Sequence, residues 1–277
     1  MRLSSSSKTP LSALIGLGAV ALYVLIALLA PQIAPFGERQ IVGAPFGDWS
    51  AKHWFGTDNL GRDMASRLIY GCRNTLFIAI LTTVLAFVFG GGIGLVAGTV
   101  GGRLERLLVW LVDVLMGVPS LIMAMLLLTV FGNSIPSMIL IIAALESTRV
   151  FRLARAVTSG IVVLDYVDAA RLRGESLGSI VLREVLPNAA TPLIAEFGLR
   201  FCFVFLFISG LSFLGLGIQP PTADWGSMVR DNASLITYGD ITPLLPAAAI
   251  GLLTIAVNLV VDWLLNATSG LREQSDG

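Results

Sequence analysis

The sequence predicts an all-α membrane protein with about six transmembrane helices. Hydrophobic residues make up 55% of the 277 residues, and the mean hydropathy is +0.84. Charged residues make up only 13%, against roughly 25% in an average soluble domain. Several apolar stretches reach the roughly 20 residues that an α-helix needs to cross the hydrocarbon core of a bilayer. We therefore expect lipid, rather than water, to surround most of the chain.

The first apolar stretch, residues 11–30, follows Arg2 and Lys8. A cleaved signal peptide is the alternative, but its apolar core spans only about 7 to 15 residues, so the length favours a membrane span. Five more spans are expected, at residues 75–98, 107–131, 135–145, 192–216 and 243–265. The fourth is the shortest, because charged residues follow it at once: Glu146, Arg149 and Arg152.

These spans predict a single membrane domain. Lys and Arg are more numerous in short cytosolic connections than in outer ones, and the most basic connection here lies between Arg149 and Pro187. Placing it inside the cell puts both termini in the cytosol. The expected parts are a cytosolic N-terminal tail at 1–10, the membrane domain at 11–266 with outer segments at 31–74 and 217–242 and a cytosolic connection at 149–190, and a cytosolic tail at 267–277.

The second span contains closely spaced glycines. Gly90, Gly91, Gly92, Gly94 and Gly98 predict close packing against another helix, because small residues let the backbones of membrane helices approach. No Lys-Ser or Lys-Thr pair follows these glycines, so they do not form a phosphate-binding loop.

The cytosolic connection is expected to hold a helix-turn-helix elbow. Asp165 can cap a short first helix, Ala169 and Ala170 favour it, and Gly174 can end it in a left-handed turn. Small side chains at Ala169, Ala170 and Gly174 would let another protein approach the backbone closely.

A second short helix is expected to open at Ser176 and to stop at Pro187. Its apolar residues recur at helical spacing, at Leu177, Ile180, Val181 and Val185. Two interpretations remain open on this pattern: the elbow docks on a partner protein, or both helices lie on the membrane surface without one.

The order of residues in this elbow resembles a known motif. Asp168-Ala169-Ala170, then Gly174, then Leu186-Pro187 is similar to the EAA loop of permease subunits in binding-protein-dependent ABC importers. Here Asp replaces the usual Glu, and Glu175 stands where Ala is common. The resemblance implies that the loop seats on a cytosolic ATPase subunit through Asp168, Ala169, Ala170, Gly174, Leu177, Val181, Leu186 and Pro187.

Two further motifs resemble the second permease of dipeptide, oligopeptide and nickel importers. The first is the segment Phe-Gly-Thr-Asp-Asn-Leu-Gly-Arg-Asp at 55–63, and the second comprises residues 211–221 followed by Asp224-Trp225-Gly226. The resemblance covers nearly the whole chain, from about Trp54 to Leu265. Near the last span, residues 261–266 depart from the family's usual ending.

The resemblance also implies partners and a location. A type I ABC importer architecture pairs the chain with a second homologous permease, cytosolic ATP-binding subunits that bind ATP and Mg, and an external solute-binding protein. The chain itself would be neither an enzyme nor a cofactor carrier. It would sit as a multi-pass protein in the bacterial inner membrane and pass peptides or a related small solute.

Three charges fall within the expected spans. Asp113 should face protein or a cavity, because a carboxylate near the bilayer centre costs roughly 2.5 to 3.5 kcal/mol on insertion scales. Glu196 and Arg200 stand four residues apart and can neutralise one another on one helix face. Structural pairing and a role in gating or substrate contact both remain open for them.

Other function classes have weaker support. An ion-gradient-driven transporter or channel could use Asp113 and Glu196, but it would have no need for the elbow. An intramembrane enzyme could use Ser209 or Ser212 as its nucleophile, but the single histidine, His53, lies outside the spans.

Two kinds of binding site are also excluded or disfavoured by composition. A formal net charge of zero without long basic runs excludes nucleic-acid binding. Cys72 and Cys202 lack the spacing of a metal site.

Overall fold

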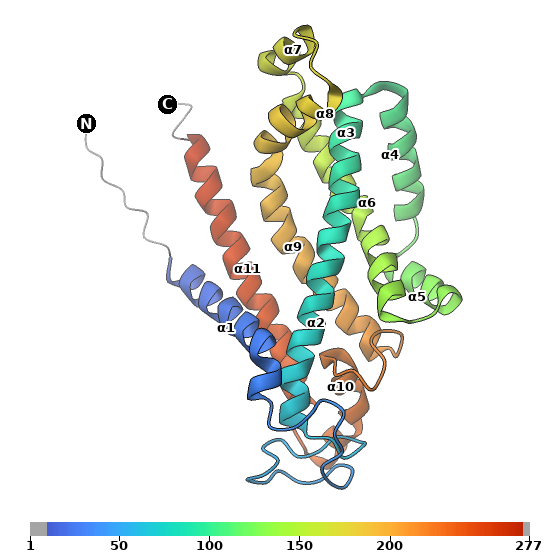
Figure 1. Ribbon diagram of the computed structural model, residues 1–277, viewed down its shortest axis with the longest axis vertical. Helices are drawn as coiled ribbons and strands as arrows, with labels where there is room; N and C mark the ends of the chain where they lie inside the picture. Colours follow the sequence, from blue (N-terminus) through green and yellow to red (C-terminus); the bar gives the residue numbers. More distant parts are fainter. Residues whose placement is uncertain (1–9, 274–277) are drawn as a thin grey trace, which may run out of the picture.

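The computed structural model describes residues 10–273, and the side chains of residues 10–266, as a bundle of long helices (Figure 1). Two isolated β-bridges are the only strand-like pairings within that range. The α-helices are α1 Leu11–Ile33, α2 Met64–Ala86, α3 Gly92–Val100, α4 Gly102–Met116, α5 Ser120–Phe131, α6 Ile135–Ile161, α7 Asp165–Leu172, α8 Leu177–Ser179, α9 Leu186–Phe213, α10 Trp225–Asn232 and α11 Leu244–Glu273, with π-helical turns η1 Phe87–Gly91 and η2 Ile180–Val185 and the 3-10 helix η3 Ala233–Tyr238.

Four helical runs in the described residues are long and apolar enough to cross a membrane. They are Leu11–Ile33, Met64–Val100, Leu177–Phe213 and Leu244–Asn266, and the bent pair α4 and α5 makes a fifth if it counts as one span. The remaining expected span corresponds to α6, which is 27 residues long but carries charged residues in its interior. The expectation of about six spans therefore holds approximately.

The third expected span, residues 107–131, is broken. The axes of α4 and α5 differ in direction by 85°. Pro119 lacks a backbone N–H and disfavours helical geometry at the residue before it, so the chain cannot continue α4 through this point. The first helix after the break, α5, starts directly at Ser120.

The predicted end of the fourth span at Leu145 is wrong. Helix α6 continues to Ile161, because its charged residues find partners instead of ending the helix. Arg149 Nη1 lies 3.3 Å from Glu146 Oε1 on the same helix, and Arg155 Nη1 lies 2.6 Å from Glu105 Oε1 on α4. Much of the expected cytosolic connection at 149–190 is thus part of a long helix.

Pro187 does not stop the second helix of the elbow, contrary to the prediction. Helix runs without interruption from Leu177 to Phe213. Pro187 lies in the first turn of α9, directly after the π-helical turn η2, where a residue without an N–H is tolerated. The elbow is therefore rigidly continuous with the fifth span.

Two other predicted segment boundaries differ from those in the structure. The outer segment expected at 31–74 ends at Asp63, whose side chain caps α2 by accepting from Ser66 N at 2.8 Å. The expected C-terminal tail begins at 267, but α11 extends to Glu273. The expected N-terminal tail lies outside the described residues, apart from Pro10.

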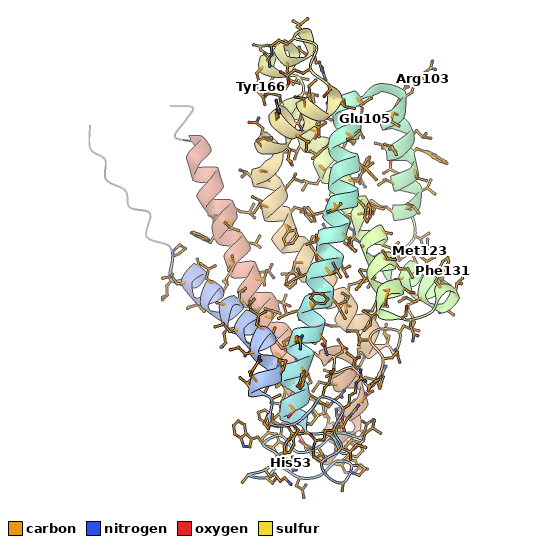
Figure 2. The ribbon with its side chains drawn as sticks, viewed as in Figure 1. His53, Arg103, Glu105, Met123, Phe131 and Tyr166 are labelled. Atoms are coloured by element: carbon orange, nitrogen blue, oxygen red, sulfur yellow. The ribbon has the colours of Figure 1, made fainter. Side chains whose placement is uncertain are left out.

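The motif at 55–63 folds into a buried polar cluster at the end of the bundle opposite α7. Asp58 Oδ2 lies 2.7 Å from Arg62 Nη2 and 3.2 Å from Arg67 Nε, and all three side chains are almost fully buried. Trp225 is also buried, and its Nε1 donates to the Leu68 carbonyl at 2.9 Å. Figure 2 shows His53 at this end of the molecule and Tyr166, on α7, at the opposite end.

Candidate functional site

Helix α7 protrudes at one end of the bundle (Figure 1). The N-terminal end of α1 and the C-terminal end of α11 point toward the same end. The predicted capping role of Asp165 is wrong, because Leu164 is the N-cap residue and no side chain caps the helix. Asp165 is instead the first helical residue, where its negative charge still favours the positive end of the helix dipole.

Gly174 ends α7 as predicted. Its φ is +76°, its N–H donates to the Arg171 carbonyl at 2.9 Å, and the Glu175 N–H donates to the Ala170 carbonyl at 3.2 Å. These two bonds form a Schellman motif, which satisfies carbonyls left free at the helix end. A Cβ at Gly174 would meet no atom within 4 Å, so the backbone conformation, not crowding, requires glycine here.

The residues of the EAA-like motif lie on two different faces of α7, one buried and one exposed. Val167 and Ala170 are fully buried against the bundle, whereas Ala169 is exposed and the Asp168 side chain is 63% exposed. Leu172, at the tip, is 90% exposed. Ala170 therefore packs inward and does not leave its backbone open to a partner, contrary to the expectation. Asp168 and Ala169 form the outward face.

Arg171 connects α7 to the second span, a contact that sequence reasoning missed. Its Nη2 donates to the Thr99 carbonyl at 3.2 Å, and its Nη1 donates to Asp168 Oδ1 at 3.3 Å. Thr99 lies in the last turn of α3, where helix carbonyls lack intrahelical partners. The spacing of Asp168 and Arg171 indicated the short pair, but not the contact with a residue 72 positions away.

The second part of the elbow opens at Ser176 as predicted, with the Ser176 hydroxyl accepting from Ser179 N at 3.3 Å. Of the predicted apolar stripe, Ile180, Val181 and Val185 are buried, and Leu177 is 43% exposed.

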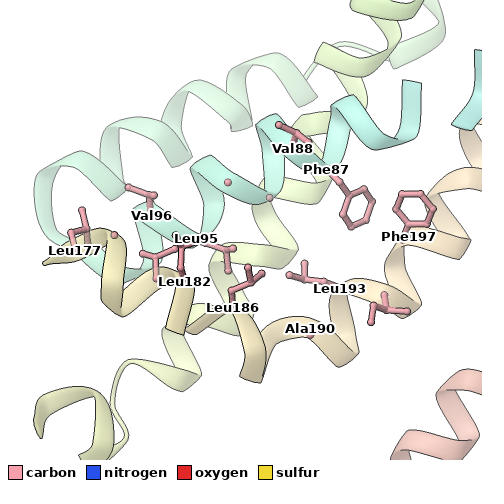
Figure 3. Close-up of a pocket in the computed structure, with 15 residues that line it drawn as sticks. Phe87, Val88, Leu95, Val96, Leu177, Leu182, Leu186, Ala190, Leu193 and Phe197 are labelled. Carbon is pink, nitrogen blue, oxygen red and sulfur yellow. The ribbon is translucent and has the colours of Figure 1, made fainter. Parts of the chain in front are cut away.

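Leu177, Val181 and Leu186 line an apolar groove of about 800 Å³ between α3 and the α8–α9 run (Figure 3). Phe87 and Phe197 meet edge-on at one end of this groove, with ring centroids 5.2 Å apart. Pro187 is exposed and does not line it. The three apolar residues of the elbow thus face the space beside the second span.

Glu196 and Arg200 pair on α9, as their spacing predicted. Arg200 Nη1 also lies 2.9 Å from Glu146 Oε2 on α6, and Glu146 is almost fully buried. The role of Glu146 was not predicted, because this residue was expected only to follow the fourth span, which was predicted to end at Leu145. The available signal was a lone carboxylate directly after an apolar run. We call Glu146, Arg149, Glu196 and Arg200 the charge cluster.

Asp113 does not join the charge cluster. Its side chain is 54% exposed, and its nearest cationic partner is Arg152, whose Nη1 lies 3.9 Å from Asp113 Oδ1. On this single chain the Asp113 side chain lies on the outward surface of α4, so the expectation that it faces protein or a cavity stays a prediction. Helix α4 packs mainly on α3 and α6, and Val112 is its one buried residue, so most of the helix faces outward.

A family model described as "Binding-protein-dependent transport system inner membrane component" matches residues 90–269. The dipeptide transport system permease protein DppC of Alkalihalophilus pseudofirmus is 32% identical over 92% of this chain and 84% of the relative. The di/tripeptide transport system permease protein DppC of Pseudomonas aeruginosa is 35% identical over 92% and 86%. A putative peptide transport system permease protein of Brucella suis is 37% identical over 90% and 84%.

A solved structure is similar in fold. It is described as the crystal structure of an amino acid ABC transporter with histidines, and it superposes with a TM-score of 0.52 at 20% identity. The similarity covers 71% of this chain and 91% of the other.

Proposed function

Because the chain belongs to the family of binding-protein-dependent transport system inner membrane components, we propose that it forms, with a second homologous permease, the solute pathway of an ATP-driven importer. It is a multi-pass permease subunit of an ABC transporter in the bacterial inner membrane. The family implies cytosolic ATPase subunits, which bind ATP and Mg, and an external solute-binding protein.

Short peptides are the proposed solutes. The relatives that support this are named as dipeptide, di/tripeptide or peptide permeases, and the similarity extends over about nine-tenths of the chain. A glutathione transport system permease of Pectobacterium atrosepticum, 31% identical over 79% of this chain, has a name that also denotes a peptide-like solute.

Coupling to the ATPase is proposed to occur through α7. The main support for this proposal is the outward face of the protruding helix α7. On this face an exposed carboxylate, Asp168, lies next to the small side chain of Ala169. A partner protein can approach such a face closely and pair a basic residue with Asp168. Gly174 and Arg171 fix the helix against the bundle, and residues 173–185 join it to the start of α9 at Leu186 and Pro187.

Reversing one charge tests this assignment. In the purified complex, Asp168→Lys is expected to weaken retention of the ATPase about tenfold, because an interfacial pair becomes a like-charge repulsion. The measurement is the amount of ATPase that copurifies with the tagged chain in mild detergent. ATP-driven uptake of a labelled dipeptide in proteoliposomes should fall in parallel.

Asp165→Lys is the matched control, since Asp165 is also exposed, also acidic and lies one turn earlier on the same helix. It should retain the ATPase. Equal loss in both variants would indicate a general effect of charge, and unchanged retention with Asp168→Lys would refute the proposed role of this face.

A further inference from the structure

A groove of about 600 Å³ runs between α1 and α2, on a face distant from the elbow. We call it the outer groove. Its lining is apolar except for two residues at one end: Val24, Ala27, Leu28, Leu76, Phe77 and Ile80 form the apolar part, and Arg73 and Asn74 form the polar end.

Arg73 is a cation without a counterion. Within the described side chains no acidic group pairs with it, whereas the nearby Arg67 is buried beside Asp58. Glu38, which contacts the neighbouring residue Asn74, is engaged elsewhere: its carboxylate accepts from Asn74 Nδ2 at 2.8 Å and from the Ala223 N–H. Arg73 is exposed, so its guanidinium is free to bind an anion from outside the chain.

The groove runs from this cation toward the middle of the membrane. Phe77 and Ile80 follow Arg73 at helical spacings of four and seven residues, so they lie on the same face of α2 and progressively farther from its outer end. On α1, which runs antiparallel to α2, Leu28 and then Val24 line the groove in the same order from its polar end toward the middle of the membrane. Leu28 is 70% exposed and Phe77 is 65% exposed, so the chain itself leaves this apolar surface uncovered.

The Arg73 guanidinium is within reach of the lipid headgroups. Helix α1 has 23 residues, about 34 Å at 1.5 Å per residue, which slightly exceeds the roughly 30 Å of hydrocarbon. Leu28, which lines the groove with Arg73, is five residues from the outer end of α1 at Ile33, about 7.5 Å along the axis. A long arginine side chain can extend over such a distance to reach the headgroup layer.

We propose that the outer groove binds an anionic phospholipid, with an acyl chain along α1 and α2 and the phosphate on Arg73. A planar guanidinium donates two parallel hydrogen bonds to a phosphate, which gives this contact both strength and orientation. An unpaired cation at the polar end of an apolar groove matches a ligand that has an anionic head and an apolar tail. The site depends on the membrane location of the chain and not on its solute.

The test compares two lipids on the purified importer complex in detergent. Phosphatidylglycerol and phosphatidylcholine with identical chains are titrated, and bound lipid is counted by native mass spectrometry. Wild type is expected to prefer phosphatidylglycerol at one site. Arg73→Gln should lower that preference about tenfold, which corresponds to the loss of roughly 1.4 kcal/mol.

Arg39→Gln is the matched control, since Arg39 is also exposed and lies in the outer segment that precedes α2 but does not line the groove. It should keep the preference. Ile80→Trp leaves Arg73 intact and fills the apolar part, so it should also reduce lipid binding.

Three results would overturn the proposal. A preference that survives Arg73→Gln would place the lipid elsewhere. Unchanged binding with Ile80→Trp, together with displacement by inorganic phosphate, would show that Arg73 binds a headgroup-sized anion without a chain in the groove. Loss of the second permease with Arg73→Gln, without change in bound lipid, would identify the face as a subunit interface. None of these readouts depends on transport, so the proposed function is tested separately.

Discussion

At the scale of single residues, Arg200 is the central member of the charge cluster. Its guanidinium contacts carboxylates on two helices, Glu146 on α6 and Glu196 on α9, and its Cζ atom lies 5.4 Å from the ring centroid of Phe203. Removing one member of a buried ion pair leaves the other charge without compensation, which costs far more than the pair contributes. In a membrane protein such charges are found where they face protein or water.

We predict that Arg200→Leu destabilises the chain by about 3 to 5 kcal/mol, because it leaves Glu146 buried and with only Arg149 beside it. The measurement is the free energy of unfolding in detergent. Arg149→Gln is the comparison, since the Arg149 side chain is 39% exposed and water can replace it. An Arg200→Leu variant as stable as wild type would show that the cluster does not stabilise the α6–α9 contact.

At the scale of elements, α3 packs closely against α6. A Cβ placed on Gly94 would lie 2.7 Å from the Phe151 carbonyl oxygen and 2.8 Å from Ala154 Cβ. Similar crowding occurs four residues away on either side, at Gly90 and Gly98, so a row of glycines faces α6. The close packing predicted from the glycines is confirmed at Gly90, Gly94 and Gly98, but not at Gly92, where an added Cβ would meet no atom within 4 Å.

Two alanine substitutions on this helix should have opposite effects. Gly94→Ala is expected to destabilise the fold by about 1 to 3 kcal/mol, because the added methyl group meets backbone atoms of α6 that cannot move aside. Gly92→Ala, where the new Cβ meets nothing within 4 Å, should stabilise it by up to about 1 kcal/mol through helix propensity. Thermal unfolding of both variants checks the signs. Equal behaviour would contradict the tight α3–α6 contact.

At the scale of the whole molecule, the elbow is connected to the spans in two ways. Continuous helix joins its second part to α9, and Arg171 joins α7 to the end of α3. A displacement of α7 by a partner therefore reaches the helices that border the apolar groove at Leu95 and Leu186. Such an element can bias a two-state change in the bundle only if these links are intact.

We predict that Arg171→Gln leaves ATPase retention unchanged but lowers dipeptide uptake per ATP hydrolysed several-fold, because the contact with the Thr99 carbonyl is weakened. Arg173→Gln is the control, since Arg173 pairs with Glu175 in the turn and is 58% exposed. The measurement is the ratio of uptake to hydrolysis in proteoliposomes. If the two variants behave alike, the Arg171 contact does not transmit the motion.

The elbow shows how far local pattern predicts structure. The helix end at Gly174 and the helix start at Ser176 were predictable, because each depends on a few adjacent residues. The continuation through Pro187 was not, because it depends on a π-helical turn that tertiary packing stabilises. The inward position of Ala170 likewise depends on which face the bundle covers.

The sequence by itself determined that the chain is helical and lies in a membrane, because span length and apolar composition are local properties that lipid selects directly. It also identified the elbow and the Glu196–Arg200 pair. Only the tertiary structure decided that Glu146 completes the charge cluster, that Arg171 reaches Thr99 and that Arg73 has no counterion among the described side chains. These contacts join residues far apart in the chain, and their partners are set by how the helices cross, which no short sequence pattern encodes.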